Sequence, residues 1–329
     1  MGSKLAQKWV KENRMPLGAQ KAGLFGAAGA ASGGGQIGLF MTGDEASGDD
    51  KTIDYVTISS AGNATNFGND VDTRYKGAGT DNGTDARGIN AGGYDSGGAT
   101  NVISYVTITS AGNAADFGDL STNKGDNPGA CSNGTNDRGV VGGAGGDGSI
   151  DYVTITSTGN ASDFGDFGAT STQRISGTSN GTDERGVFWG GFRDATSTNN
   201  IDYITINSTG NASDFGDLSL GRSWTSACSN DTDDRGICYS GNGTNRIDYI
   251  TITSTGNATD FGNSVINSGE GARGGTDSGT DNIGVFGGGN DTSGDEIDTI
   301  TISSTGDASD FGNLTVGRYA VNACANSKA

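Results

Sequence analysis

The chain has 329 residues with 61 glycines, two prolines and no histidine, and its formal net charge is −19. An acidic surface repels nucleic acid and anionic membranes, so we expect no nucleic-acid partner and no membrane insertion. The lack of histidine removes the usual zinc ligand and every Ser-His or Cys-His nucleophile pair, which favours a protein that is not an enzyme but leaves carboxylate catalysis open.

Residues 1–32 form a predicted N-terminal arm whose charge differs from that of the rest of the chain. The arm carries a net charge of +4, whereas residues 33–329 carry −23. Its first half, "GSKLAQKWVKENRMP", predicts a short helix, and a flexible stretch rich in glycine and alanine follows. We expect the arm to anchor the protein in a larger assembly through Leu5, Trp9, Val10, Leu24 and Phe25. The alternative is that the arm packs against its own chain.

Residues 33–329 contain six copies of one repeat. The segment "IDYVTI" and its variants begin at Ile53, Ile103, Ile150, Ile201, Ile247 and Ile297, and the phenylalanine of a "DFG" or "NFG" follows each isoleucine after 14 residues. A period of 46 to 51 residues with β-type segments is typical of propeller blades. Asp-Phe-Gly also holds a metal ion in protein kinases, but its recurrence favours a structural role, with the phenylalanine between blades and the glycine at a strand bend.

Each repeat predicts four strands. The first is a small-residue segment such as "SWTSACS", the second resembles "RGVFWGG", the third is "IDYVTI" and the fourth surrounds "DFGDL". After the arm the chain enters with a second strand, "QIGLFMTG", and it finishes with a first strand, "VGRYAVNACANSKA". We therefore predict an all-β, six-bladed β-propeller with four-stranded blades. Pairing of the N- and C-terminal strands closes it, with the C-terminal strand innermost.

The repeat resembles that of kelch propellers. A glycine doublet follows the second strand at Gly92-Gly93, Gly142-Gly143, Gly190-Gly191 and Gly287-Gly288, and a basic residue follows the phenylalanine at Arg74, Lys124, Arg174, Arg222, Arg273 and Arg318. The chain departs from the kelch pattern by using phenylalanine for the usual tryptophan. Units such as "IDYVTITSTGNASDFGD" more specifically resemble kelch-like propellers encoded by tailed, often marine, bacteriophages. This resemblance covers about residues 33–329 and implies a virion or tail protein.

The connections between strands differ in how much their length varies. The 1–2 turns are constant in five copies and the 3–4 turns in all six, whereas the 2–3 and 4–1 connections vary. In an up-and-down sheet both variable sets lie on one face, where recognition is usually placed. The candidate ligand-facing residues are Tyr94, Asp95, Phe192, Arg193, Asp194, Arg246, Asn290 and Asp291. The alternative is that these loops are merely solvated.

The repeated basic residues have repeated acidic neighbours, at Asp54, Asp151, Asp202, Asp248 and Asp298. We interpret them as structural ion pairs, with an anion site on the propeller axis as the alternative. Asp and Asn, which recur in the repeats, are residue types that bind calcium. However, no D-x-D-x-D-G loop occurs, so we expect no cofactor. The four cysteines have no CxxC spacing and are predicted to be buried fillers, with a Cys228–Cys238 disulfide as the alternative.

Together these features predict a non-enzymatic phage protein located in the virion and associated with its tail. The arm is expected to bind other virion proteins, and the variable connections are expected to attach to a glycan or protein of the host surface. Two alternatives stay open. One is a structural decoration or tail component without a receptor, and the other is a carbohydrate-active propeller enzyme.

Overall fold

The computed structural model describes residues 36–45, 48–82, 86–133, 137–144, 146, 148–169, 172–180, 184–230, 233–268, 272–289 and 294–326. The chain divides into two units, Met1–Ala30 and Ala31–Ala329, and every described residue belongs to the second. Seven predicted site residues therefore lie outside the described residues: Leu5, Trp9, Val10, Leu24, Phe25, Asn290 and Asp291.

The described part of the chain is all-β apart from one 3-10 helix, η1 (Gly279–Asp281). It contains six antiparallel sheets of four strands, named here from the inner to the outer strand. Sheet 1 contains β29 (Asn322–Ala325), β1 (Ile37–Glu45), β2 (Gly48–Thr57) and β3 (Thr65–Asn69). Sheet 2 contains β4 (Ala78–Asp81), β5 (Arg87–Ala91), β8 (Val102–Thr107) and β9 (Ala115–Asp119). Sheet 3 contains β10 (Gly129–Ser132), β11 (Arg138–Gly142), β12 (Ser149–Thr154) and β13 (Ser162–Asp166).

The other three large sheets repeat this order. Sheet 4 contains β15 (Ser176–Ser179), β16 (Arg185–Trp189), β19 (Asn200–Thr205) and β20 (Ser213–Asp217). Sheet 5 contains β21 (Ser226–Asn230), β22 (Arg235–Gly241), β23 (Thr244–Thr251) and β24 (Thr259–Ser268). Sheet 6 contains β25 (Gly274–Asp277), β26 (Ile283–Gly287), β27 (Glu296–Thr301) and β28 (Ser309–Asn313).

Two small sheets lie in the connections between these strands. One joins β6 (Tyr94–Asp95) to β7 (Gly98–Ala99), and the other joins β14 (Thr172–Gln173), β17 (Phe192–Arg193) and β18 (Thr196–Ser197).

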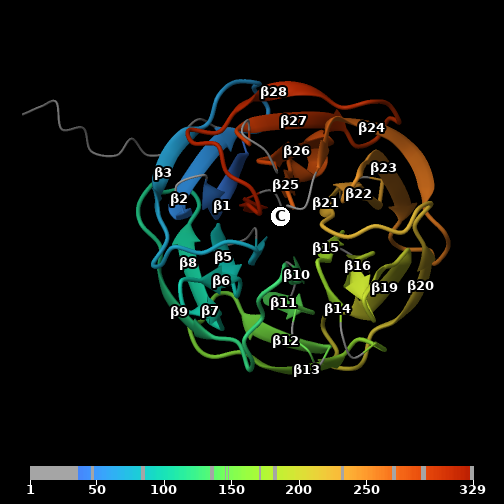
Figure 1. Ribbon diagram of the computed structural model, residues 1–329, viewed down its shortest axis with the longest axis horizontal. Coiled ribbons are helices and arrows are strands. Elements are labelled where there is room, and N and C mark those ends of the chain that lie inside the picture. The colour runs from blue at the N-terminus through green and yellow to red at the C-terminus, as the bar shows by residue number, and fades with distance from the viewer. Residues whose placement is uncertain are drawn as a thin grey trace, which may run out of the picture. The chain divides into compact units, whose positions relative to one another are not determined.

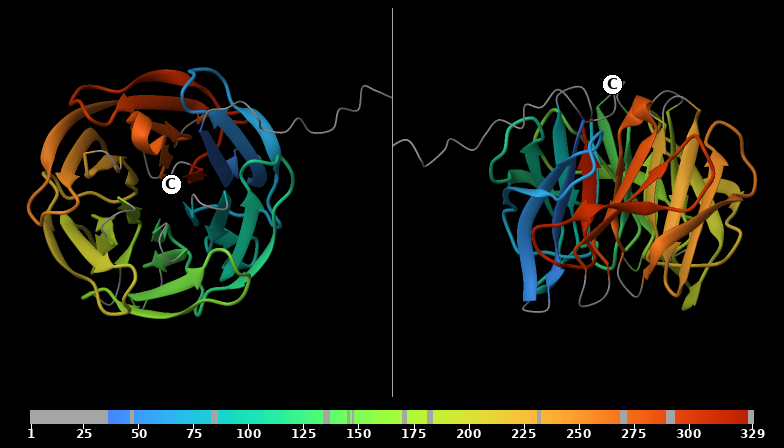
Figure 2. Two further views of the ribbon diagram at one scale, coloured as in Figure 1. Left: turned by 180° about the vertical axis from the view of Figure 1, so that it is seen from behind. Right: turned by 90° about the horizontal axis from the view of Figure 1, so that it is seen from above.

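The six large sheets lie around a common centre, with the first strand of each sheet innermost (Figure 1). Each inner strand contacts the inner strands on both sides, in the cyclic order β4, β10, β15, β21, β25 and β29. The edge-on view in Figure 2 shows the strands running from one face of this ring to the other. The described sheets therefore form a complete cycle with no gap between the first and the last.

Sheet 1 combines strands from both ends of the chain. β29 pairs antiparallel with β1, from Gly38 opposite Ala325 to Met41 opposite Asn322. β29 is the innermost strand of this sheet and contacts β25 on one side and β4 on the other. The predicted pairing of the N- and C-terminal strands, with the C-terminal strand innermost, is confirmed.

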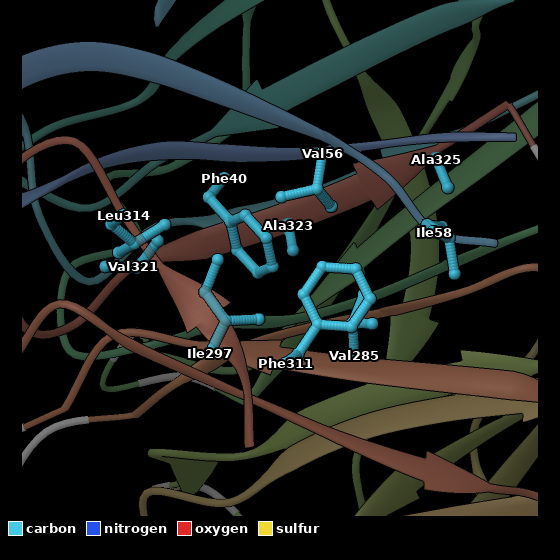
Figure 3. Close-up of a cluster of buried hydrophobic side chains, with 10 residues drawn as sticks. All are labelled: Phe40, Val56, Ile58, Val285, Ile297, Phe311, Leu314, Val321, Ala323 and Ala325. Carbon is cyan, nitrogen blue, oxygen red and sulfur yellow. The ribbon is translucent and has the colours of Figure 1, made fainter. Parts of the chain in front are cut away.

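The hydrophobic core is divided among the interfaces between neighbouring sheets. Six buried clusters are present among the described residues, one at each interface. Figure 3 shows the cluster between sheets 6 and 1, where Phe40 and Val56 face Val285, Ile297 and Phe311. Because each fully buried large apolar side chain contributes about 1.5–3 kcal/mol, burial holds each sheet to both of its neighbours.

The repeated Asp-Phe-Gly forms a β-bulge in the outer strand of every large sheet. In sheet 3, Ile150 is opposite Gly165 and Asp151 is opposite Asp163, so Phe164 is the extra residue. The bulge turns the phenylalanine into the interface with the next sheet, where Phe164 is 2% exposed and packs with Ile204 and Ile206. The predicted roles of the phenylalanine, between sheets, and of the glycine, at a strand bend, are confirmed.

All four cysteines are free and buried. Cys238 lies opposite Ala227, and Cys228 lies opposite Ile237, on paired strands, but the two thiols are not bonded. Burial raises the pKa of the Cys238 thiol to about 11, so it stays protonated and unreactive at neutral pH. The prediction of buried fillers is confirmed, and the alternative disulfide is wrong.

Candidate functional site

The 2–3 and 4–1 connections contact each other, and we call the face that they share the variable face. Tyr75, in a 4–1 connection, bridges Tyr94, in a 2–3 connection, with N–O distances of 3.1 and 2.8 Å. β14 pairs with β17 in the same way, and Asp44 bridges Tyr319. The predicted common face of the two variable sets is confirmed for these connections.

Four of the repeated cations form the predicted ion pairs with the aspartate of their own sheet. The N–O distances are 3.7 Å for Lys124–Asp151, 2.8 Å for Arg222–Asp248, 2.9 Å for Arg273–Asp298 and 3.1 Å for Arg318–Asp54. Each of these side chains is at most 2% exposed. A buried charge must be paired, so these cations serve the fold.

Arg74 departs from this pattern because sheet 2 has Ser104 in place of the repeated aspartate. The Arg74 guanidinium donates to Ser104 Oγ at 2.6 Å and pairs with Asp70, four residues earlier, at 2.9 Å. The cation is still buried and paired, but its acid comes from its own connection.

Arg174 departs further, because it does not pair with Asp202, the repeated aspartate of its own sheet. Arg193 of β17 forms an ion pair with Asp202 instead. The small β14–β17–β18 sheet brings Arg193 to this carboxylate, which releases Arg174 for other contacts. Arg174 Nε donates to Asp126 Oδ2 at 2.7 Å, and its guanidinium lies 4.7 Å from the ring centroids of both Phe192 and Trp224.

These contacts belong to an unrepeated group on the variable face. We define the aromatic–cation cluster as Tyr75, Lys76, Tyr94, Asp126, Arg174, Phe192 and Trp224. Lys76 Nζ lies 4.5 Å from the Trp224 ring centroid and 5.5 and 5.7 Å from those of Tyr75 and Tyr94. The two tyrosine rings stack, with centroids 5.7 Å apart and planes inclined by 29°. Rings and cations therefore alternate, and each such contact contributes about 0.5–2 kcal/mol.

Asp126 joins the two cations of the cluster. Its carboxylate lies 3.4 Å from Lys76 Nζ and 2.7 Å from Arg174 Nε. The Asp126 side chain is 11% exposed, whereas Lys76 is 20% and Arg174 is 29% exposed. With neutral tyrosines the cluster carries a net charge of about +1, in contrast to the acidic chain around it, and its cations reach solvent.

The backbone of the cluster is unusual. Lys76, Arg174 and Trp224 have φ values of 59°, 58° and 60°, in the left-handed region that non-glycine residues rarely adopt. Backbone hydrogen bonds between neighbouring connections fix this conformation, from Lys76 N to Ala320 O at 3.1 Å and from Trp224 N to Arg174 O at 2.9 Å. The inner ends of the 4–1 connections thus hold the three side chains in place.

Tyr94 has a shifted pKa. Burial raises the pKa of its hydroxyl above the ordinary 10.0, the Asp126 carboxylate raises it further, and the Arg174 guanidinium opposes the rise. Because the folded-state pKa exceeds the unfolded one, the stability gained from neutral Tyr94 is fully present below pH 10 and is lost as the pH rises through the folded pKa.

We expect the Asp126→Asn change to lower the pKa of Tyr94, because it removes the nearby negative charge and leaves Lys76 and Arg174 in place. The measurement is an ultraviolet absorbance titration, with the Tyr94 signal isolated by subtracting the curve of a Tyr94→Phe variant. Asp163→Asn, which changes an exposed acid of β13, is the control and should leave the Tyr94 titration unchanged. Equal Tyr94 pKa values in the parent protein and Asp126→Asn would contradict the cluster geometry.

The structure brings only two of the predicted site residues together in this cluster, Tyr94 and Phe192. Asp95 accepts a hydrogen bond from Gly97 N at 2.6 Å within its own turn, and Arg246 pairs with Asp248 and Asp260 in sheet 5. Arg193 and Asp194 line a separate surface hollow with Asp202 and Asp214.

Sequence reasoning did not identify Tyr75, Lys76, Asp126, Arg174 and Trp224 as site residues. The available signal was a lack of repetition, since the position two residues after Arg74 and Arg222 holds Lys76 and Trp224. Tryptophan occurs only three times in the chain, which singles out Trp224 further.

No three His, Cys, Asp or Glu side chains gather closely enough to hold a metal ion among the residues that the structure describes. Within the same ranges, no helix is long and apolar enough to span a membrane.

The site therefore offers aromatic rings, two partly exposed cations and one carboxylate, a set of groups suited to binding a polar ligand.

Comparison of the sequence with models of known protein families gives no match, and neither does comparison with curated proteins.

Proposed function

We propose that residues 33–329 form a six-bladed, kelch-like β-propeller that a tailed phage carries on its particle, in the tail, as a non-enzymatic host-attachment protein. Three features support the propeller: the six four-stranded sheets, the cycle of contacts between their inner strands, and the six buried clusters between neighbouring sheets. The pairing of β29 with β1 is the closure expected of such a ring.

The observation that carries the binding function is the aromatic–cation cluster. The scaffold repeats its core, its bulges and most of its ion pairs from sheet to sheet, whereas Lys76, Arg174 and Trp224 occur at related positions without repeating one another. Partly exposed charges beside aromatic rings add little to a core that the repeated residues already supply. A role in recognition explains why these groups gather on the variable face.

Binding suits this cluster better than catalysis does. Its carboxylate, Asp126, lies between two cations at 3.4 and 2.7 Å, so its oxygens are engaged in ion pairs rather than directed at a substrate. The phage origin and the tail location are supported by the resemblance of the repeat to phage-encoded propellers. In this proposal the basic arm, residues 1–32, binds other virion proteins and the variable face points outward.

Mass spectrometry of purified particles and a competition assay test the proposal. We expect peptides of this chain in the particles, and we expect the purified full-length protein, added first, to reduce adsorption of those particles to host cells. Bovine serum albumin at equal concentration is the control and should not reduce adsorption. Particles without the protein would overturn the virion assignment. Its presence without any competition would favour a structural component that has no receptor, and turnover of host glycans by the purified protein would favour an enzyme.

A further inference from the structure

The aromatic–cation cluster lies beside a cavity on the ring axis. This cavity has a volume of about 50 Å³ and is lined by the inner ends of the 4–1 connections and the first strands of the sheets. Gly77, Ile175 and Thr225 line it, and each directly follows a cluster residue, namely Lys76, Arg174 and Trp224. A ligand held by the cluster would therefore reach the mouth of the axial cavity.

Two residues that line the cavity, Asn127 and Ser226, each have a buried side-chain oxygen with no hydrogen-bond partner among the described residues. Asn127 is 6% exposed and Ser226 is 4% exposed. Native proteins pair almost all such atoms with protein groups, water or a ligand. Asn127 lies directly between the two cluster cations, because its N–H donates to Lys76 O at 3.0 Å and its carbonyl accepts from Ile175 N at 3.2 Å.

Arg174 presents the end of its guanidinium for a ligand. Nε is bound to Asp126, whereas Nη1 and Nη2 make no hydrogen bond to any residue within the described ranges. Phe192 and Trp224, each 4.7 Å away, hold the guanidinium in place, and 29% of the side chain is exposed. A planar fork with two available N–H groups matches a carboxylate, which accepts two parallel hydrogen bonds.

The geometry points to an acidic saccharide, a sugar that carries a carboxylate, as the ligand of this site. The carboxylate pairs with the Arg174 fork, with Lys76 beside it, and the flat C–H face of the ring packs on Tyr94 or Phe192. The hydroxyls then face the mouth of the axial cavity beside Asn127. Residues 33–329 carry a charge of −23, which disfavours a densely acidic peptide and favours a ligand whose carboxylates are spaced by neutral hydroxyls. This inference rests on the proposed attachment function, because it names the ligand class of the same face.

Calorimetric titration of the full-length protein tests the ligand class with three probes: trigalacturonate, its methyl ester and a triglutamate peptide. We expect trigalacturonate to bind, and the methyl ester, which keeps the sugar rings but lacks the charges, to bind at least tenfold more weakly. Arg174→Met keeps the contacts with the two rings but removes the fork, and it should weaken trigalacturonate binding at least tenfold. Arg174→Lys keeps the charge without the fork, and its affinity for trigalacturonate should lie between those of the parent protein and Arg174→Met.

Arg185→Met is the matched control, since Arg185 is a half-buried cation of sheet 4 that lies 4.7 Å from the Tyr203 ring centroid and outside the cluster, and it should change the affinity less than twofold. Equal affinity for the acid and its ester, or unchanged binding by Arg174→Met, would overturn the site. Tighter binding of triglutamate would overturn the saccharide in favour of an acidic peptide. Absence of trigalacturonate binding would overturn the ligand class alone, because the competition assay on host cells judges the attachment function separately.

Discussion

Replacing Gly165 with alanine should lower the melting temperature of the protein by about 5 °C or more. Gly165 follows the bulged Phe164 and has a φ of 148°, which only glycine adopts readily. An alanine Cβ would lie 2.5 Å from Gly210 O and 2.6 Å from Gly210 C, which belong to the 3–4 turn of sheet 4. Since both atoms are backbone, no side-chain rotation relieves the clash, and sheets 3 and 4 must separate. We expect the strain to cost about 3 kcal/mol.

The same contact carries the hydrogen bonds between these two sheets. Gly210 N donates to Phe164 O at 2.8 Å, and Asp166 N donates to Asn211 Oδ1 at 3.1 Å. Gly168→Ala is the matched control, because a Cβ at Gly168 meets nothing within 4 Å, and the melting temperature should change by about 1 °C or less. Scanning calorimetry at one fixed rate gives both values. Similar melting temperatures for the two variants would show that the bulge does not hold the sheets together.

The sequence predicts the repeated part of this architecture because its constant spacings have a direct physical cause. Ile150 and Phe164 lie 14 residues apart because the two strands and their turn have a fixed length, and the bulge places Gly165 opposite Ile150. The same spacing in all six repeats therefore predicts the same outer hairpin six times. The same reasoning predicts that β29 completes sheet 1. The segment QIGLFMTG is a second strand with no first strand before it, so the C-terminal strand takes that place.

The candidate site could not be predicted in this way because its residues do not repeat. Asp126 contacts Lys76, 50 positions earlier, and Arg174, 48 positions later, only because neighbouring sheets bring their connections together around the axis. The ion-pair partners of Arg174 and Asp202 could not be predicted for a related reason. Alignment of the repeats equates Arg174 with the other cations, but it does not contain the β17–β18 hairpin that brings Arg193 to Asp202.

Replacing Arg318 with methionine should destabilise the protein by about 3–5 kcal/mol, because it leaves the buried carboxylate of Asp54 without its cation. The Arg318 side chain is fully buried, and its Nη1 lies 3.7 Å from Asp50 Oδ2 of β2 in addition to three closer contacts within sheet 1. Its Nη1 lies 3.1 Å from Asp54 Oδ2, its Nη2 donates to Phe40 O at 3.1 Å, and its Nε donates to Thr42 O at 2.9 Å. Arg318 precedes β29, whereas its partners lie in β1 and β2, so this one side chain joins the two ends of the folded chain.

The matching change in sheet 5, Arg222→Met, separates the effect of a lost ion pair from the effect of an opened ring. Arg222 pairs with Asp248 at 2.8 Å, equally buried, but the four strands of sheet 5 are consecutive in sequence. Both variants should lose global stability in a urea titration. Only Arg318→Met should speed amide hydrogen exchange in β29 and β1 well before global unfolding. The reason is that no short turn connects β29 to β1, the strand with which it pairs. Unchanged exchange at the amides of Leu39 and Met41 in that variant would show that the backbone pairing of β29 with β1 closes the ring without Arg318.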